Sequence, residues 1–219
     1  MRVSKSCYIA VSRTCGMVVV FVLSVFVSGC NRAALRIYGV GDSFPPASTH
    51  FSSKVQHPYT VYIALPEDRT SEYYGHSIAG TSWQATKTDT FGGDAMPNII
   101  CQELLREVQS SKLFSGVSRV KEKEDLVLET EVRAFGAQVR GFIFSRIGGV
   151  SSFKFTLKRG NKILFEKVYE KVVKDGDPEY TGKSVGFIED GMRATMSDSF
   201  REILKAFFAD LEQLNIASE

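Results

Sequence analysis

The sequence is poor in the patterns that mark metal sites and catalytic sites. Its 219 residues include four cysteines and three histidines. No histidine lies in a metal-ligand spacing such as H-E-x-x-H, and no C-x-x-C pair is present. The G-x-S-x-G nucleophile elbow and the glycine-rich phosphate loop are also missing. We therefore expect a protein that is not an enzyme and that uses no metal and no other cofactor.

Three short motifs could belong to a site but lack the necessary context. Gly39-Val40-Gly41 and Gly148-Gly149 do not stand between a strand and a helix, as a dinucleotide site requires. We interpret Gly148-Gly149 as a turn that leads into a strand. Glu67 and Asp68 are adjacent, and adjacent side chains on an extended chain point apart. We interpret this pair as a solvated turn.

Long apolar runs are also scarce, because only one is present. This excludes a membrane protein with several spans. The composition, 43% hydrophobic and 24% charged, excludes collagen-like, low-complexity and wholly disordered chains. The length suits one domain with tails, or two small domains.

The single apolar run lies near the amino terminus. Residues 1–29 carry three basic residues and no acidic one, and the apolar run extends from Met17 to Val27. Small residues, Ser28 and Gly29, follow it. A basic start, a short apolar run and a small-residue cleavage site are typical of a secretory signal peptide, and the run is too short to span a membrane.

The tetrad V-S-G-C at 27–30 resembles the lipobox of bacterial lipoproteins. The resemblance implies cleavage between Gly29 and Cys30 and acylation of Cys30, which would hold the mature protein on a lipid bilayer. The next residue is Asn31 rather than aspartate, and by the same resemblance this favours the outer membrane, with the body facing the periplasm. The alternative is an ordinary secretory signal that ends near a cysteine.

Removing the signal changes the charge and the cysteine count. Three of the 27 basic residues lie in 1–29, so 24 basic residues remain against 25 acidic ones. No electrostatic case for nucleic acid binding remains. Cys7 and Cys15 leave with the signal and Cys30 takes lipid, so Cys101 cannot form an intramolecular disulfide. We expect Cys101 to be a small buried hydrophobe.

The mature chain divides into a tether and one domain. Residues 30–58 are rich in glycine, proline and serine and read as the lipidated cysteine and a flexible tether. Residues 59–214 form the expected periplasmic domain, and 215–219 are a short tail.

Two helices and several strands are expected in the domain. Apolar residues at helical spacing predict helices over 94–111 and about 188–214, with Glu103 and Glu107 on the exposed face of the first. Period-two alternation predicts a strand from 126 whose even positions through 134 are buried. Shorter strands are expected over 59–65 and 117–121. The turn Gly160-Asn161 predicts a hairpin, with a bulge between Phe165 and Val168 in its second strand.

The order of these elements predicts an α+β fold. We expect a single antiparallel sheet of four to five strands, with both amphipathic helices packed on one face.

The polar segment 67–93 is unusually long for a loop in a compact domain. It contains four aromatic residues of interest, which are Tyr73, Tyr74, Trp83 and Phe91. These side chains could contact a partner, or they could fold back over the edge of the core.

Several segments together resemble the ABC-type transport auxiliary lipoproteins and are also similar to the YajG-like lipoproteins. They are V-S-G-C at 27–30, L-F-S-G-V at 113–117, D-L-V-L-E-T-E-V-R-A-F at 125–135 and the final amphipathic helix. The resemblance covers most of 59–214 and implies no catalytic residue. It implies a periplasmic accessory part that helps an inner-membrane transporter move lipid or another hydrophobic solute.

Three functions are consistent with these features. The first is a non-enzymatic, membrane-anchored lipoprotein that acts as an accessory component of an envelope transport or assembly system, with an envelope protein as its partner. The second is a module that binds lipid or lipopolysaccharide, which needs an apolar cavity of a few hundred cubic ångströms. The third is a structural or surface lipoprotein with no transport role.

Overall fold

The structure, a computed structural model, describes residues 51–85, 95–120, 125–140, 146–180 and 188–216. The expected signal peptide 1–29, the lipidation site at Cys30, most of the expected tether and the end of the tail lie outside these residues. The elements in chain order are β1 (His57–Ile63), β2 (Glu67–Asp68), α2 (Ala95–Ser111), β3 (Phe114–Ser118), β4 (Leu126–Arg140), β5 (Arg146–Arg159), β6 (Lys162–Lys174) and α3 (Ile188–Gln213).

The six strands of the described residues form one mixed sheet, so the prediction of an antiparallel sheet of four to five strands is wrong. The order is β3-β1-β4-β5-β6, and β2 pairs with β4. β1 runs parallel to both β3 and β4, and β2 is also parallel to β4. The helix α2 connects β1 to β3, and a helical crossover returns the chain to the same end of the sheet, which makes the two strands parallel. β4, β5 and β6 are antiparallel, as expected.

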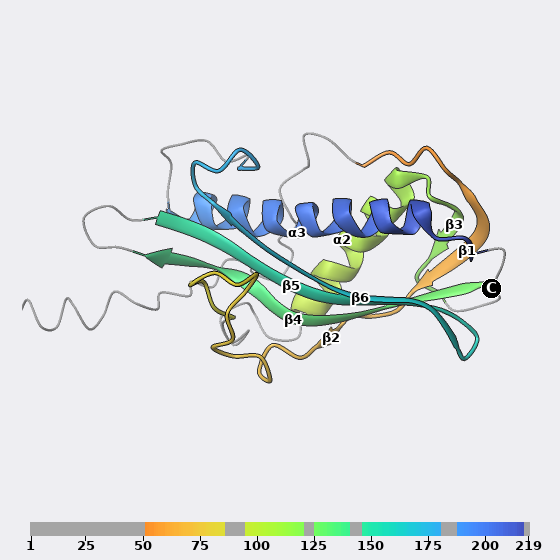
Figure 1. The fold of residues 1–219 in the computed structure, drawn as a ribbon, viewed down its shortest axis with the longest axis horizontal. Coiled ribbons are helices and arrows are strands. Elements are labelled where there is room, and N and C mark those ends of the chain that lie inside the picture. The colour runs from red at the N-terminus through yellow and green to blue at the C-terminus, as the bar shows by residue number, and fades with distance from the viewer. Residues whose placement is uncertain (1–50, 86–94, 121–124, 141–145, 181–187, 217–219) are drawn as a thin grey trace, which may run out of the picture.

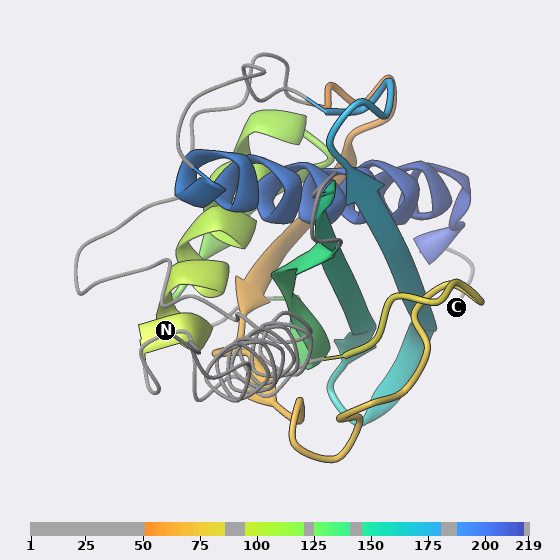
Figure 2. The ribbon, with the colours of Figure 1, turned by 90° about the vertical axis from the view of Figure 1, so that its left-hand side faces the viewer.

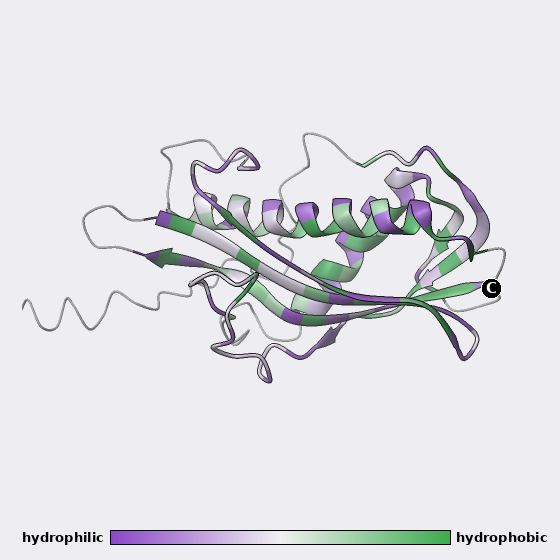
Figure 3. Ribbon diagram, viewed as in Figure 1, coloured by the Kyte–Doolittle hydropathy of each residue, from purple (hydrophilic) through white to green (hydrophobic). Residues whose placement is uncertain are grey.

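Both helices pack on one face of the sheet, as predicted (Figures 1 and 2). α3 lies along β5 and β6, whereas α2 lies nearer β1 and β3. Hydrophobic and hydrophilic residues alternate around α3 (Figure 3). The apolar residues Met96, Ile100, Leu104 and Val108, which recur at helical spacing along α2, are buried. Cys101 is buried beside them, which confirms its expected role.

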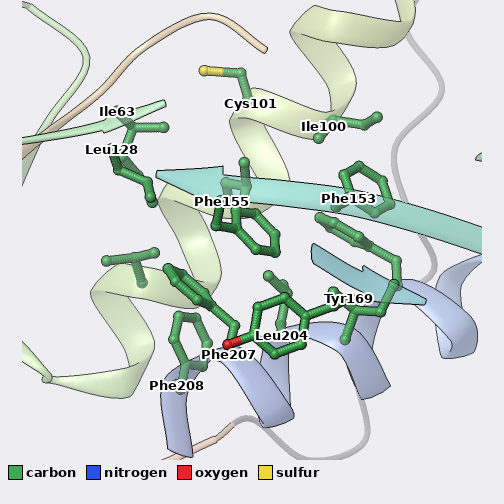
Figure 4. Packing of buried hydrophobic residues seen from close by; sticks show 14 of the residues in the cluster. Ile63, Ile100, Cys101, Leu128, Phe153, Phe155, Tyr169, Leu204, Phe207 and Phe208 are labelled. Atoms are coloured by element: carbon green, nitrogen blue, oxygen red, sulfur yellow. The ribbon is translucent and has the colours of Figure 1, made fainter. Parts of the chain in front are cut away.

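Stacked aromatic rings join α3 to the sheet (Figure 4). The rings of Phe155 on β5 and Phe207 on α3 stack at 19° with centroids 4.3 Å apart. Phe153 and Phe200 also contact each other, with centroids 4.8 Å apart and the rings tilted by 45°. At the edge strand, the Tyr169 hydroxyl donates a hydrogen bond to the carboxylate of Asp210 on α3. Burial and this carboxylate both raise the pKa of Tyr169, which therefore stays protonated.

The Gly148-Gly149 pair lies inside β5 and is not a turn, contrary to the sequence prediction. A Cβ atom on Gly149 would lie 2.1 Å from the carbonyl oxygen of Thr195 on α3. The helix backbone therefore rests directly on the strand, and only glycine leaves enough space at this position.

A bulge in β4 reverses which residues face the helices. The register shifts between Val132 and Ala134, so Arg133 is the extra residue. The even positions through Val132 face the helices, as predicted. Beyond the bulge Phe135 faces them instead, and Ala134 belongs to a cluster on the opposite face. Ala134 is therefore buried as predicted, but on the face opposite the helices and not under them.

The second strand of the hairpin is also bulged, although earlier than expected. The pairing with β5 shifts between Ile163 and Phe165, which makes Leu164 the extra residue. The turn at Gly160-Asn161 is where the sequence places it, and Gly160 has a φ of 57°, in the left-handed region that favours glycine. β3 covers Phe114–Ser118 and so begins three residues before the expected strand.

The expected exposure of Glu103 and Glu107 on α2 is wrong, because both are buried. The Glu103 carboxylate lies 2.5 Å from Nη2 of Arg106 and 3.4 Å from Nη2 of Arg201 on α3. Burial raises the pKa of Glu103, and this effect outweighs the two neighbouring cations, which lower it. A polar layer thus links the two helices beside the apolar core.

The raised pKa of Glu103 predicts a defined pH dependence of stability. The folded protein holds the Glu103 proton more tightly than the unfolded chain does, so stability falls as pH rises above the ordinary value of 4.5. We expect the variant Glu103→Gln to lack this decline. Urea unfolding of the mature protein at a series of pH values above 4.5 measures the difference.

Glu166→Gln is the matched control for this prediction. Glu166 is exposed, and its hydrogen bond from Lys154 lowers its pKa. Its contribution is therefore lost as pH falls below 4.5, the opposite window. Parallel stability curves for wild type and Glu103→Gln above this pH would contradict the prediction.

Candidate partner-binding strap on the outer face of the sheet

Residues 69–85, here called the strap, cross the face of the sheet that the helices leave open (Figure 2). Three strap residues, Ile78, Trp83 and Ala85, pack on sheet residues Ala134, Val150 and Val172. These sheet positions come from β4, β5 and β6, so the strap covers all three strands. The strap is thus part of a second, smaller hydrophobic cluster.

Trp83 is buried in this cluster, with 5% of its surface exposed. Its ring lies over Gly148, where a Cβ atom would be 2.5 Å from the ring carbon Cη2. The Arg140 guanidinium lies on the ring, 4.4 Å from its centroid. The same guanidinium donates a hydrogen bond of 2.8 Å to the carbonyl of Ser82. Trp83 is therefore held between a strand and a stacked cation.

The bulge at Arg133 brings Ala134 into the surface that the strap covers. Because the bulge turns Ala134 to the outer face, this side chain joins Val150 and Val172 in the cluster under the strap. The Trp83 ring itself rests on Gly148, which pairs with Gln138 of β4. A side chain at Gly148 would therefore displace the ring.

Local turns and hydrogen bonds give the strap its shape. Gly75 and Gly80 have φ angles of 81° and 67°, which favour glycine. The amide of Ile78 donates to the carbonyl of Trp83 at 2.8 Å. The amide of Ala79 donates to the Glu170 carboxylate on β6, also at 2.8 Å. The strap is therefore held by hydrogen bonds between its own residues and by a hydrogen bond to the edge strand β6.

The four aromatic residues expected either to contact a partner or to fold back over the core edge have different surroundings. Trp83 is covered, and Tyr73 packs partly against the cluster, with the Arg133 guanidinium 4.8 Å from its ring centroid. Tyr74 is 38% exposed. Phe91 lies outside the described residues. Of the three described residues, Tyr74 presents the largest side-chain surface to a partner, and the contact itself stays a prediction.

The other side chains that could act in catalysis or ligand binding have partners within the body. Nε2 of the buried His57 lies 3.0 Å from the carbonyl oxygen of Leu211. Burial raises the pKa of the Cys101 thiol. Glu67 pairs with Arg69, while Asp68 accepts hydrogen bonds from Thr70. Glu67 and Asp68 form β2 rather than the expected turn. Because the two carboxylates have different partners, they do not act as a pair.

A small cavity lies between the two helices. Its volume is about 10 Å³, which is room for about one water molecule. It is lined by Phe51, Glu107, Arg201, Leu204, Lys205 and Phe208. This cavity is far too small for a lipid chain. Within the described ranges, no group of three or more histidine, cysteine or acidic residues could hold a metal ion.

No family model matches the chain, and no curated protein matches it. The fold is similar to that of a Xanthomonas campestris protein of the family DUF330, at a TM-score of 0.49 and 12% identity, covering 80% of this chain and 95% of that one. It is also similar to PelC of Paraburkholderia phytofirmans, solved as a dodecamer, at a TM-score of 0.41 and 8% identity, covering 75% and 94%.

A third similar structure is a minor lipoprotein of Acinetobacter baumannii, at a TM-score of 0.32 and 9% identity, covering 71% of this chain and 91% of that one. None of these likenesses assigns a family or an activity to this chain. The resemblance to ABC-type transport auxiliary lipoproteins and YajG-like lipoproteins therefore stays a prediction.

The contact between Trp83 and Gly148 predicts strong coupling between two distant positions. Gly148→Ala should destabilise the protein by about 1–3 kcal/mol, because the added methyl group displaces the indole. In a Trp83→Ala background the same substitution should cost far less, because the ring that it displaces is absent. Urea unfolding of the four proteins of this double-mutant cycle measures the coupling.

Gly160→Ala is the control in the same cycle. A Cβ atom at Gly160 meets nothing within 4 Å, although its φ of 57° adds strain. Its cost should be the same with and without Trp83. Equal costs of Gly148→Ala in both backgrounds would show that the indole does not rest on this glycine.

Proposed function

We propose that this chain is the precursor of an envelope lipoprotein whose body acts through protein contacts and not through catalysis. The observation that carries the proposal is V-S-G-C at 27–30, placed directly after the apolar run that ends at Val27. The small residues give a peptidase access to the backbone, and the Cys30 thiol accepts the lipid. The mature protein then starts at an acylated Cys30.

Acylation would hold the body permanently at a bilayer. One acyl chain gives only marginal, reversible membrane binding, whereas several chains on one residue bind far more strongly. None of the helices in the described parts of the chain has the length and apolarity to cross a membrane. Asn31 after the acylated cysteine favours the outer membrane, with the body in the periplasm.

The contacts of the body support a non-catalytic role. Each chemically capable group singled out by the sequence and placed by the structure is used in packing or in a hydrogen bond, as His57, Cys101 and Glu67 are. We infer that the protein is an accessory component of an envelope transport or assembly system. The resemblance stated above would make its partner an inner-membrane transporter of lipid or another hydrophobic solute.

The lipid anchor is tested by mass spectrometry and by fractionation of cell membranes. The mature protein should begin at Cys30 and carry the mass of its acyl chains. Cys30→Ala should abolish both the processing and the membrane association that survives high salt. Asn31→Asp, the matched control, should leave acylation intact and move the protein to the inner membrane. An unmodified thiol at Cys30, or a chain that still begins at Met1, would contradict the proposal.

The accessory role is tested by photo-crosslinking in the native cell. A photoreactive residue at Tyr74, on the strap, should capture one defined envelope protein. The same residue at Val168, which is 39% exposed on β6, serves as the control for random collisions. Repeated failure to capture a protein at Tyr74, or the same products at both positions, would count against a partner at the strap.

A further inference from the structure

We propose that one end of the sheet, formed by the β5–β6 hairpin and the first described residues, rests on the anionic lipid surface that holds Cys30. This end, here called the hairpin end, comprises residues 53–59, 158–163 and 212–216. The inference rests on the proposed lipid anchor and adds an orientation to it. The anchor alone requires no contact between the body and the bilayer.

Contacts between distant parts of the chain define the hairpin end. The Glu212 carboxylate accepts hydrogen bonds from the Ser53 hydroxyl at 2.6 Å and from the Lys54 amide at 2.7 Å. Arg159 stacks on Tyr59, 4.6 Å from the ring centroid, and donates to the carbonyl of Ile216 at 3.2 Å. The hairpin, the end of α3 and the start of β1 therefore lie at the same end of the sheet (Figure 1).

The described chain begins beside this end, with Phe51 packed on Phe208 of α3 at a centroid distance of 5.3 Å. Residues 31–50 join it to Cys30 and could extend over at most about 70 Å. A link of this length leaves the body free to stand away from the bilayer. Contact with the bilayer must therefore come from the chemistry of the surface.

The hairpin end combines exposed apolar side chains with basic ones. Ile163 is 51% exposed next to the turn, and Val55 is 43% exposed in the first segment. Lys162 and Lys54 are their exposed neighbours in the chain, and Arg159 lies across the turn. Apolar residues set among bases bind at the interface of anionic bilayers, because the side chains enter the headgroup region while the cations meet phosphates.

Three described carboxylates near the hairpin end have partners within the body. Glu212 accepts the bonds described above, Asp125 accepts from the Thr60 amide at 2.9 Å, and Glu129 pairs with Lys158 at 2.6 Å. At the opposite end, the carboxylates of Asp175 and Asp177 likewise accept hydrogen bonds, from the amides of Ile147 and Lys174.

The balance of charge distinguishes the two ends. The three ranges that define the hairpin end hold four basic residues and one carboxylate, whereas Arg146 and Lys174 at the opposite end stand beside Asp175 and Asp177. This balance favours the Gly160 end as the one that meets an anionic surface.

The test places a fluorescent probe at each end of the hairpin in the full mature lipoprotein. Cysteines replace Asn161 at the hairpin end and Asp177 at the opposite end, in a Cys101→Ala background, and carry an environment-sensitive dye. The protein is reconstituted in vesicles of equal parts phosphatidylethanolamine and phosphatidylglycerol. In some vesicles the lipid acyl chains carry bromine near the headgroup, which quenches a dye that enters this region. We expect a blue shift and quenching at position 161 and neither at position 177.

Two surface variants separate the proposed contact from general proximity. Lys162→Glu combined with Ile163→Asn should reduce quenching at position 161 by about two-fold or more. Val168→Asn, which changes an exposed apolar residue in the middle of the same strand, should leave the quenching unchanged. Equal signals at positions 161 and 177, or no effect of the double variant, would overturn the inference.

The mass of the amino-terminal peptide, measured on the same sample, separates this inference from the proposed function. If Cys30 is acylated and the probe at position 161 stays in water, the anchor stands and the orientation is wrong. If Cys30 is not acylated, both the proposed function and this inference fall.

Discussion

The close approach of α3 to β5 at Gly149 is the constraint on which the rest of the fold depends. The helix carbonyl of Thr195 occupies the space that any side chain at this position would fill. This approach brings the rings of Phe200 and Phe207 into contact with those of Phe153 and Phe155. On the other face, Gly148 lets Trp83 lie equally close. Two adjacent glycines thus allow both faces of one strand to be covered, because neighbouring residues of a strand point to opposite faces.

The folded body and the proposed lipid anchor depend on different parts of the chain. The anchor depends on a short segment, V-S-G-C, which is recognised before or during export and needs no folded structure. The body buries His57, Cys101 and several carboxylates in packing and hydrogen bonds, and covers part of its second face with the strap. Under the proposals above, it would meet a partner or a bilayer through its surface, at Tyr74 and at the hairpin end. A lipid-held body of this kind would act by position and contact.

Local periodicity predicts the helices and antiparallel strands well, whereas three long-range features defeat it. The parallel pairing of β1 with β3 is encoded in the strand-helix-strand order over β1, α2 and β3, and not in the periodicity of any one strand. The bulge at Arg133 does not disturb the alternation of apolar and polar residues along β4, because alanine at position 134 is compatible with either face of the sheet. The buried Glu103 was missed because its exposure depends on Arg201, which lies about one hundred residues further along the chain.

The sequence by itself determined the two amphipathic helices and the hairpin turn, and it alone carries the pattern from which the export signal and the lipidation site are proposed. Each is encoded in a continuous stretch whose composition or spacing carries the physical property. Only the tertiary structure decided that Gly148 and Gly149 lie inside a strand, that Trp83 is buried and that the hairpin lies beside the start of the described chain. These features arise from contacts between residues far apart in the chain, and a local pattern carries no information about which distant residue will meet it.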